Sequence, residues 1–415
     1  MKRTLVISNA CFSDMTSNGR TLKNLFHGAN KNRLAQFFVY GEPDFEVCER
    51  YYKVSDGDAL QSLLINKRSG EVHENRAETR ASEKGLLGGA GKNVKKTPVK
   101  VLGRELVWWI GRWKNSRFWK WIEEFNPEII CLFIANNTFL ISLSRQIAER
   151  YHIPIIIYTT EGYSFMNYNY FTKCFSVTYN MYYAWLCREY KRVSAYVEKG
   201  FFNSTLLRDR YEAEYGYPCY CVMNSSQIEY MEHEQAGNEL KISYLGNLGL
   251  GRHKALMEIG QALQKIDTEL YLDIYGAVSE ESVRKELGES AGIKFHGFIS
   301  YDKVVNVIHG SDLLIHTELN DAVMNRDLKY AFSTKIADCV CSGTPLLMYA
   351  SEELAETMFL KENGCAFIVN RKEELKGVLK KALTDREARI EVLEKAKITR
   401  DIFLTGNEKF LEALM

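Results

Sequence analysis

The stretch "YLGNLGLGRHKAL", residues 244–256, connects an apolar run to a helical pattern through three glycines. Leu256, Ile259, Leu263 and Ile266 then recur on one face of a helix. A strand, a glycine turn and a helix form the general plan of a phosphate site, because glycines let backbone N–H groups approach the anion and a helix start carries partial positive charge. The stretch therefore predicts an α/β unit with a candidate anion site.

The order of these glycines differs from two common nucleotide motifs. Gly246, Gly249 and Gly251 give G-x-x-G-x-G, whereas dinucleotide folds use G-x-G-x-x-G and P-loops use G-x-x-x-x-G-K-[ST]. The next apolar run, "LYLDIYG", also ends without the acidic residue that binds ribose in dinucleotide sites. Arg252 and Lys254 stand at the helix start, where they would neutralise a diphosphate. The spacing leaves two interpretations open, phosphate binding and a structural glycine turn.

Short apolar runs alternate with helical patterns along the whole chain. This alternation is typical of the α/β class, in which helices cover both faces of a parallel sheet. Two series of runs predict two doubly wound, Rossmann-like domains at residues 1–235 and 236–395, with a C-terminal helix at 396–415 that packs back on the first domain. The runs are "TLVIS", "AQFFVY", "EIICLFIA", "IPIIIYTT", "LKISYLG", "LYLDIYG", "IKFHG", "DLLIHT" and "PLLMYA".

Composition narrows the class of protein. The chain has 415 residues, of which 46% are apolar, and it contains no apolar stretch of about 18 residues that could span a bilayer. Its start lacks the pattern of a secretory signal, and its ten cysteines lack metal-ligand spacing, which favours reduced thiols in the cytoplasm. A net charge of +1 excludes a globally basic protein that binds nucleic acid.

The charge is uneven, however, around a tryptophan-rich segment. Residues 66–120 hold fourteen Lys or Arg against five Glu, a local charge of +9. We expect a mobile basic loop at about 66–99, followed by a Trp/Arg-rich helix at about 100–125 that carries five of the six tryptophans. Two interpretations stay open for this helix. It either packs on the domain core, or contacts an anionic membrane or a lipid acceptor.

A second constellation lies in "KYAFSTKIADCVCSGTPLLMYA". The pattern predicts a helix that begins near Ser333 and ends at Gly343. Thr334 and Asp338 are four residues apart and so share one face of that helix. Lys335 lies in the first turn, where its charge opposes the helix dipole unless an anion is near. The segment is therefore either a site for a ribose and a phosphate or a solvated helix face.

Taken in order, the motifs resemble the C-terminal half of the retaining GT-B glycosyltransferases of the group 1, family-four type. The resemblance covers residues 240–395 well and the first half loosely. It implies two Rossmann-like domains whose parallel sheets face across a cleft, and transfer of a sugar from a nucleotide diphosphate donor with retention at the anomeric carbon. The motifs that carry it are "YLGNLGLGRHKAL", "IYGAV", "KFHGFIS", "SDLLIHTE", "STKIADCVCSGTPLL" and "ENGCAFIV".

The resemblance assigns donor-binding residues in the second half. The family's phosphate-binding Lys falls on Arg252, and the Arg that commonly follows the first glycine is Asn247 here, so Lys254 would share its work. The family's ribose-binding Glu falls on Asp338, while its partner Glu is replaced by Tyr330. The full set of implied donor contacts is Gly246, Asn247, Gly249, Gly251, Lys254, His296, Gly297, Phe298, Glu318, Ser333, Thr334 and Asp338.

In the first half, the acceptor side is expected at strand ends. The candidates are Gly19, Asn136 and Asn137, together with Glu161, whose carboxylate would contact an acceptor hydroxyl or serve only as a turn or helix cap. Asp56 and Asp58 in "SDGDAL" imitate a metal-binding D-x-D, but their place before a helical pattern predicts a turn and a helix cap.

The implied reaction needs no cofactor and no metal. Arg252 and Lys335 would stabilise the departing diphosphate, with Glu161 as a third residue expected to take part in catalysis. The Trp/Arg-rich segment favours a saccharide or lipid-linked acceptor in bacterial surface polysaccharide synthesis, and a cytoplasmic protein that is peripheral to the inner face of the membrane. Two alternatives stay open: an isomerase similar to nucleotide-sugar 2-epimerases, and a non-catalytic relative that binds a sugar or a partner.

Overall fold

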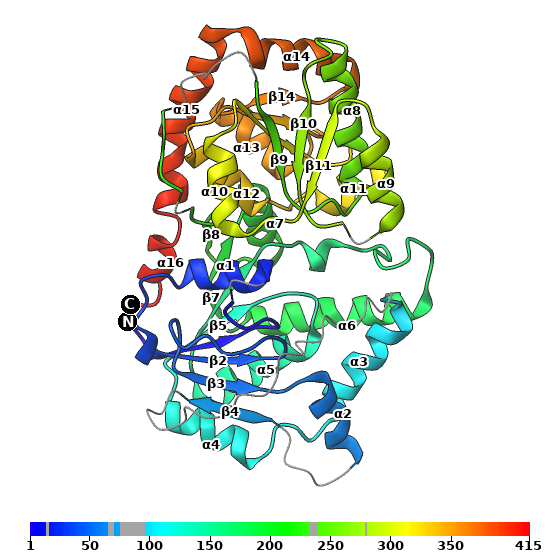
Figure 1. Ribbon diagram of the computed structural model, residues 1–415. Helices are drawn as coiled ribbons and strands as arrows, with labels where there is room; N and C mark the ends of the chain where they lie inside the picture. The colour runs from blue at the N-terminus through cyan, green and yellow to red at the C-terminus, as the bar shows by residue number, and fades with distance from the viewer. Residues whose placement is uncertain (14–15, 65–69, 75–95, 227, 233–239, 279) are drawn as a thin grey trace, which may run out of the picture. The chain divides into compact units, whose positions relative to one another are not determined.

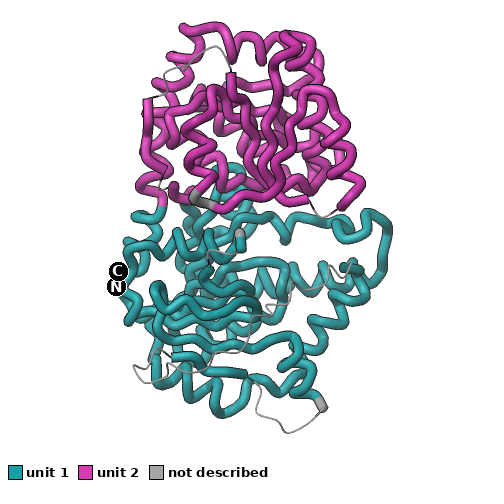
Figure 2. Tube along the Cα trace, viewed as in Figure 1, with its two compact units in different colours: residues 1–222, 407–415 teal, residues 223–406 magenta. Residues whose placement is uncertain are grey.

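The computed structural model describes the chain except for residues 14–15, 65–69, 75–95, 227, 233–239 and 279. The described residues form two compact units (Figure 2). Unit 1 consists of residues 1–222 and 407–415, and unit 2 consists of residues 223–406. The loop predicted at 66–99 lies mostly outside the described residues.

Unit 1 is built on an eight-stranded sheet in the order β4-β3-β2-β1-β5-β6-β7-β8 (Figure 1). All neighbours are parallel except β3 and β4. Strands β1, β5 and β6 are buried along their whole length, which explains why the sequence there is almost continuously apolar. The strands are β1 (Thr4–Ile7), β2 (Leu34–Phe38), β3 (Arg50–Lys53), β4 (Glu71–Glu74), β5 (Ile129–Phe133), β6 (Ile155–Thr159), β7 (Val197–Phe202) and β8 (Cys219–Cys221).

Helices cover this sheet, and the C-terminus returns to it. Phe410 lies in the last helix, and its ring is 5.1 Å from the ring of Phe26 and 5.3 Å from that of Phe201. The backbone N–H of Lys2 donates to the carbonyl of Leu414 at 2.6 Å. The helices of unit 1 are α1 (Ser17–Leu25), α2 (Asp56–Leu64), α3 (Pro98–Ile110), α4 (Ser116–Phe125), α5 (Thr138–Tyr151), α6 (Val177–Ser194), α7 (Thr205–Tyr215) and α16 (Glu408–Glu412).

The Trp/Arg-rich segment is two helices rather than the single helix we predicted. Helix α3 ends at Gly111, and α4 begins after Asn115, whose side chain accepts the N–H of Phe118 at 3.1 Å. Trp108 and Trp113 are buried, so aromatic rings that the sequence presented as one segment are divided between the core and the surface.

Unit 2 is built on a fully parallel six-stranded sheet in the order β11-β10-β9-β12-β13-β14. Each of the nine predicted apolar runs of the chain forms a strand. The weaker strands β3, β4, β7, β8 and β14 carried no clear signal. The strands of unit 2 are β9 (Ile242–Leu245), β10 (Leu272–Tyr275), β11 (Ile293–Gly297), β12 (Leu313–Thr317), β13 (Leu346–Tyr349) and β14 (Phe367–Val369).

The helices of unit 2 bury the faces that the periodicity predicted. Leu256, Ile259 and Leu263 are fully buried in the core under α8, and Ile266 packs at its border. Helix α8 packs against α9 and α14, while α12 packs against α15. The helices are α8 (Arg252–Gln264), α9 (Glu281–Glu289), α10 (Tyr301–His309), α11 (Ala322–Leu328), α12 (Thr334–Cys341), α13 (Ala355–Asn363), α14 (Lys372–Thr384) and α15 (Arg386–Leu404).

The unit boundaries differ from those we predicted. The first unit ends at Val222 rather than at residue 235. The polar residues that follow belong to unit 2, because the N–H of Ser226 donates to Phe403 and the N–H of Met231 donates to Ser342. At the C-terminus, only residues 407–415 join unit 1, whereas the prediction gave that role to 396–415.

Candidate active site

The glycine loop follows β9 and is held in shape from within. The N–H of Gly246 donates to the carbonyl of Tyr275 at the end of β10, at 2.9 Å. The side chain of Asn247 accepts the N–H of Gly249 at 2.6 Å, and its carbonyl accepts the hydroxyl of Tyr244 at 2.9 Å. Asn247 therefore has a structural role here that an Arg would not fill.

At two positions of this loop, Gly246 and Gly251, a side chain would clash with a neighbouring residue. A Cβ on Gly246 would lie 2.9 Å from Cε of Lys335, so this glycine brings the loop against α12. Gly251 has a φ of +76° and faces Leu319, and Leu250 before it also has a positive φ. No side chain caps the start of α8, because Gly251 is its N-cap residue. The loop thus leaves a helix start without a side-chain acceptor.

Arg252 forms a buried ion pair with Glu318, which lies just after β12. Its Nε and Nη2 donate to the same carboxylate oxygen at 2.9 and 2.5 Å. Its Nη1 lies 3.5 Å from the carbonyl of Asn247 and so faces the glycine loop. Burial alone would lower the pKa of Arg252, but the Glu318 carboxylate more than offsets this and raises it. The guanidinium is therefore a fixed cation with one edge toward the loop.

Lys335 is a second cation at the same place. It is half-buried in the first turn of α12 and makes no hydrogen bond or ion pair with another residue that the structure describes. Burial and the neighbouring Arg252 lower its pKa. Lysines in such surroundings normally have a counter-ion. Lys335 is thus positioned to bind an anion beside Gly246.

The start of α12 is held by a distant carboxylate instead of its own cap residue. The side chain of Ser333 makes no capping hydrogen bond, whereas its N–H donates to the carboxylate of Glu356 at 3.1 Å. Nε2 of His316 lies 3.6 Å from the same Glu356 oxygen. Thr334 is half-buried beside Lys335. Glu356 of α13 therefore fixes the helix that carries Lys335.

Asp338 lies one turn further along α12. It accepts the hydroxyl of Ser226 at 2.6 Å. Ser226 comes from the polar segment that we had assigned to the first domain. The carboxylate predicted to bind ribose therefore has a protein partner of its own, and both residues belong to unit 2.

A comparison with known families decides what this site belongs to. Residues 227–399 match the family described as glycosyl transferases group 1. The match covers the glycine loop, Arg252 and the whole of α12. Unit 2 is a group 1 glycosyltransferase domain. No curated protein matches the chain by sequence.

Solved structures of the GT-B fold match both units of this glycosyltransferase. The Anabaena protein HepE, in a complex with UDP and glucose, matches with 12% identity and a TM-score of 0.61, covering 100% of this chain and 99% of that one. WaaG, described as a glycosyltransferase involved in lipopolysaccharide biosynthesis, matches with 11% identity, a TM-score of 0.59 and 99% of both chains. The α,α-trehalose-phosphate synthase (UDP-forming) of Burkholderia xenovorans, in a complex with glucose-6-phosphate, matches with 10% identity, a TM-score of 0.58 and 99% of both chains.

The segment expected to border the nucleobase of the glycosyltransferase donor lies at the end of β11. His296 stacks on Tyr275 with ring centroids 4.6 Å apart, and its Nε2 is 2.5 Å from the Asp273 carboxylate. Gly297 has a φ of +75°, and Phe298 after it is 79% exposed. An exposed phenylalanine beside a left-handed glycine suits stacking against a planar ring, and it stays a prediction that this ring is a base.

The other predicted donor residues lie around these groups. Lys254 is exposed in the first turn of α8, and Gly249 is exposed in the loop. Together with the residues above, they bring the predicted donor set of unit 2 to the carboxyl edge of its sheet, where ligands of open α/β sheets bind.

The acceptor candidates lie in unit 1, at the carboxyl ends of its strands. Glu161 follows β6, and its carboxylate makes no hydrogen bond with a described residue. Burial raises the pKa of Glu161 to about 7. Asn137 precedes α5, and its side-chain oxygen is buried without a partner. The amide of Asn136 donates to the hydroxyl of Tyr170 at 2.9 Å. Gly19 lies in the first turn of α1, where its N–H donates to Thr16.

Two acidic clusters resemble metal sites in their composition. Ligand atoms of His316, Glu318 and Glu356 lie within 4.8 Å of one another. However, the Glu318 carboxylate already accepts hydrogen bonds from Arg252, and Lys335 is close by. This cluster does not fit a divalent ion, because the ion would have to displace buried cations. The D-x-D motif at residues 56–58 starts α2, where Asp58 accepts the N–H of Ser55 and Asp56 pairs with Arg104.

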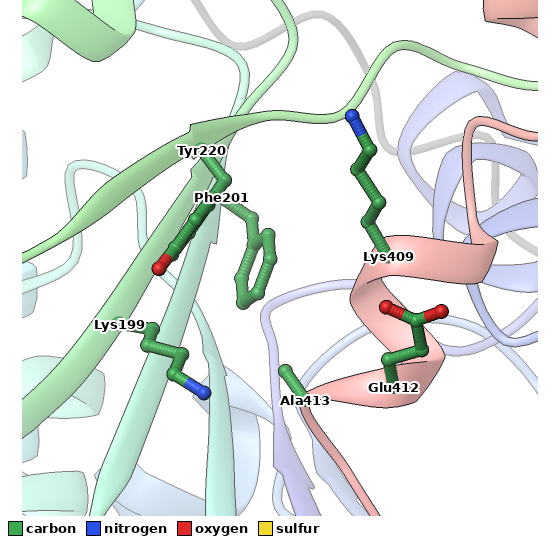
Figure 3. Close-up of a pocket in the computed structure, with 6 residues that line it drawn as sticks. All are labelled: Lys199, Phe201, Tyr220, Lys409, Glu412 and Ala413. Carbon is green, nitrogen blue, oxygen red and sulfur yellow. The ribbon is translucent and has the colours of Figure 1, made fainter.

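A cavity of about 380 Å³ lies elsewhere in unit 1, between β7, β8 and α16. Figure 3 shows two lysines and two aromatic rings around it. No residue predicted to bind donor or acceptor lines it, so it is separate from the candidate site. The lining residues are Lys199, Phe201, Tyr220, Lys409, Glu412 and Ala413.

Three site residues were missed by the sequence analysis. Glu356 and His316 are buried beside the two cations, and Ser226 contacts Asp338. Glu356 lies in the first turn of α13, where the neighbouring residues are buried and an acid is unusual. Ser226 carried no signal, because it reaches α12 from a distant part of the chain. His316 lies in the motif "SDLLIHTE" two residues before Glu318, but its place in an apolar run gave no reason to single it out.

Proposed function

We propose that this glycosyltransferase moves a sugar from a nucleotide diphosphate donor to a saccharide or lipid-linked acceptor, with retention at the anomeric carbon, in bacterial surface polysaccharide synthesis. The observation that carries the proposal is the pair of cations at the glycine loop. Arg252 is fixed by Glu318, and Lys335 has no partner among the described residues. A diphosphate at Gly246 would give Lys335 a direct hydrogen-bonding partner. HepE, which has the same fold, was crystallised with UDP and glucose.

The cations would act mainly on the departing diphosphate. Negative charge grows on its β-phosphate as the bond to the sugar breaks, and fixed positive groups stabilise that charge without reorganising. We propose that Arg252, Lys335 and the N–H groups at the start of α8 supply this stabilisation, with no metal ion. Transfer that persists in excess EDTA would support this, and loss of transfer that Mg²⁺ restores would contradict it.

Retention rests on the resemblance to the retaining family. In that family the leaving phosphate is commonly proposed to assist the incoming hydroxyl, so a separate base is not required. NMR of the freshly formed product gives the anomeric configuration directly. A product whose configuration is inverted relative to the donor would reject the retaining assignment and leave the transferase assignment intact.

Polar oxygens in unit 1 support a hydroxyl-rich acceptor. Within the described part of the chain, the buried side-chain oxygens of Asn9 and Asn137 have no hydrogen-bond partner, and the Glu161 carboxylate accepts no hydrogen bond. They follow β1, β5 and β6, which are neighbours in the sheet. Acceptor oxygens that lack donors would be satisfied by sugar hydroxyls.

The first experiment is a thermal-shift screen of nucleotide sugars, because a ligand that binds the native state raises its stability. The ligands that stabilise the protein are then incubated with and without saccharide and lipid-linked acceptors. Formation of a glycosylated product supports the proposal. An epimer of the donor, formed without acceptor, would indicate the isomerase instead, and binding without any turnover would indicate a non-catalytic relative.

We also propose that unit 1 contacts an anionic membrane, through the first of the two helices of the Trp/Arg-rich segment and its neighbours. The outer face of α3 presents Val99, Leu106, Trp109 and Ile110, which are 40–66% exposed. Helix α3 packs beside α2 and α6 (Figure 1), and exposed apolar side chains continue onto both. These are Leu60, Leu63 and Met181. Exposed apolar side chains on three helices that pack together support an interaction site there.

Charge favours lipid as the partner. Lys100, Arg112 and Arg188 are exposed around this face, and Glu105 and Glu189, the acids of α3 and α6, are buried. Exposed apolar side chains with exposed cations on or beside the same helices suit an anionic membrane surface. No helix in the described part of the chain is long and apolar enough to cross a membrane.

Vesicle binding tests this second proposal. Deleting residues 99–125 would remove the buried Trp108 and Trp113, so point substitutions are preferable. We expect a Trp109→Ser and Ile110→Ser double variant to lose binding to phosphatidylglycerol vesicles in a sedimentation assay. Ile398→Ser, which removes a 75% exposed side chain from α15, is the matched control. Equal binding by both variants would remove the basis for membrane contact at α3.

A further inference from the structure

Two buried carboxyl groups lie together beneath the glycine loop. Glu318 and Glu356 are each 3% exposed, and they lie within 4.8 Å of each other and of His316. One oxygen of each is buried without a hydrogen-bond partner among the described residues, Oε2 of Glu318 and Oε1 of Glu356. Buried carboxylate oxygens are seldom left in this state, because each loses its hydration without compensation.

The two carboxyl groups hold the two elements that carry the cations. Glu318 accepts both hydrogen bonds from Arg252 at the start of α8. Glu356 accepts the N–H of Ser333 at the start of α12, which carries Lys335. A change in the ionisation of either carboxyl group would therefore be felt at both cations.

Without ligand, the charges in this cluster nearly cancel. Arg252 of α8 and Lys335 of α12 supply two positive charges, and the two carboxylates would supply two negative ones. The other titratable groups that face the pair are His316 on β12 and Tyr244 on β9. A bound diphosphate would add negative charge beside Arg252 and Lys335 and leave the cluster with an excess of anions.

We propose that Glu318 and Glu356 are positioning residues that act as one proton-binding pair, and that this pair takes up a proton when the donor diphosphate binds. The proton comes from solvent and adds to a carboxyl oxygen, and no other bond is made or broken. It removes the charge of one of two buried carboxylates, each of which keeps an oxygen without a hydrogen-bond partner among the described residues. The inference rests on the proposed donor site at the glycine loop.

The pKa shifts of Glu318 and Glu356 in the free protein also support a proton-binding pair. Burial and the Glu356 carboxylate raise the pKa of Glu318. Burial also disfavours ionised Glu356, but His316 and the N–H of Ser333 more than offset this and lower its pKa. Two carboxyl groups this close cannot both ionise freely, so they titrate as a pair. An incoming anion shifts the pair further toward its protonated form, and the affinity for diphosphate rises as the pH falls.

Calorimetry measures the proton directly. UDP is titrated into the full chain in buffers of different ionisation enthalpy, from pH 5.5 to 8.5. We expect the wild type to take up about half a proton or more per UDP beyond the amount measured for Glu318→Gln, because the amide cannot titrate. The comparison cancels the ionisation of UDP itself. Glu289→Gln, an exposed change on α9, should match the wild type. Equal uptake in the wild type, Glu318→Gln and Glu356→Gln would overturn the inference.

A second measurement does not need the nucleotide. A carboxyl group with a raised pKa in the folded state favours folding while it is protonated, and this advantage is lost as the pH rises from about 4.3 through the folded pKa. The thermal midpoint of the wild type should therefore fall relative to that of Glu318→Gln over this window. If the thermal midpoints of the wild type and Glu318→Gln change with pH in parallel, the proposal of a proton-binding pair is wrong. If the profiles diverge but UDP and GDP do not bind, the donor site is wrong and the carboxyl pair stands.

Discussion

Each unit contains a buried glutamate that caps a distant helix beside an arginine, but only one of these networks is complete. In unit 1, one oxygen of Glu105 accepts the N–H and the hydroxyl of Thr138 at 2.9 and 2.5 Å, at the start of α5. Its other oxygen lies 3.5 Å from Arg104, which pairs in turn with Asp56. In unit 2, Glu356 caps α12 in the same way, yet Glu356 and Glu318 each keep an orphaned oxygen.

The difference separates a structural network from a functional one. Both oxygens of Glu105 contact protein donors, and the arginine beside it pairs with two carboxylates. The Glu318 and Glu356 network leaves oxygens and Lys335 unsatisfied at the edge of the sheet where ligands bind. Incomplete polar networks are costly, and they persist where a ligand completes them.

The largest effect on stability is expected when Glu105 is removed. Glu105→Ala should destabilise unit 1 by about 3–5 kcal/mol, because it leaves buried donors of α5 and a buried arginine unpaired. Urea denaturation followed by circular dichroism measures the loss. Glu149→Ala, at an exposed position on α5, should change little. A loss below about 1 kcal/mol would mean that the Glu105 network is not structural.

Substitution of Arg252 should lower both the stability and the rate of transfer. Arg252→Ala removes a phosphate contact and also leaves Glu318 buried without its partner, so we expect a loss of about 3 kcal/mol in stability together with roughly 100-fold slower transfer. The double variant Arg252→Ala with Glu318→Gln should recover stability but not activity. Recovery of both would show that Arg252 acts only through the fold.

Lys335 should affect function alone. Lys335→Ala is expected to slow transfer by about 10²–10³-fold with little change in the thermal midpoint, because the lysine forms no hydrogen bond or ion pair with a described residue. Initial rates at saturating donor give the first value and a thermal scan gives the second. Lys376→Ala, an exposed change on α14, is the control. Normal rates for Lys335→Ala would remove the central support for the donor site.

The smallest effect is expected at Asp338. Asp338→Ala should weaken nucleotide binding by about tenfold, the effect of one lost hydrogen bond to a charged group. Calorimetry with UDP measures the affinity, and Ser226→Ala separates the partner from the carboxylate. Unchanged affinity in Asp338→Ala would assign this residue to the fold, as the counterpart of Glu105.

Much of the fold could be predicted because its signals are local. All nine apolar runs form strands, and the face of α8 that carries Leu256 and Ile259 is buried as its spacing required. The short strands β8 and β14, and the antiparallel β4, escaped because tertiary pairing rather than their own composition makes them strands. The single helix predicted at 100–125 was wrong because Gly111 and the Asn115 cap divide it.

The motifs of the candidate site could be predicted from the sequence, but the contacts between its residues could not. The sequence by itself determined the glycine loop, the cation at Arg252 and the Lys335 helix, because these depend on spacing along one strand, one turn and one helix. Only the tertiary structure decided that Arg252 is held by Glu318, that Glu356 and Ser226 reach α12, and that Lys335 keeps no partner among the described residues. Ion pairs between distant residues depend on how helices pack across a sheet, and a single sequence does not record which buried charges meet.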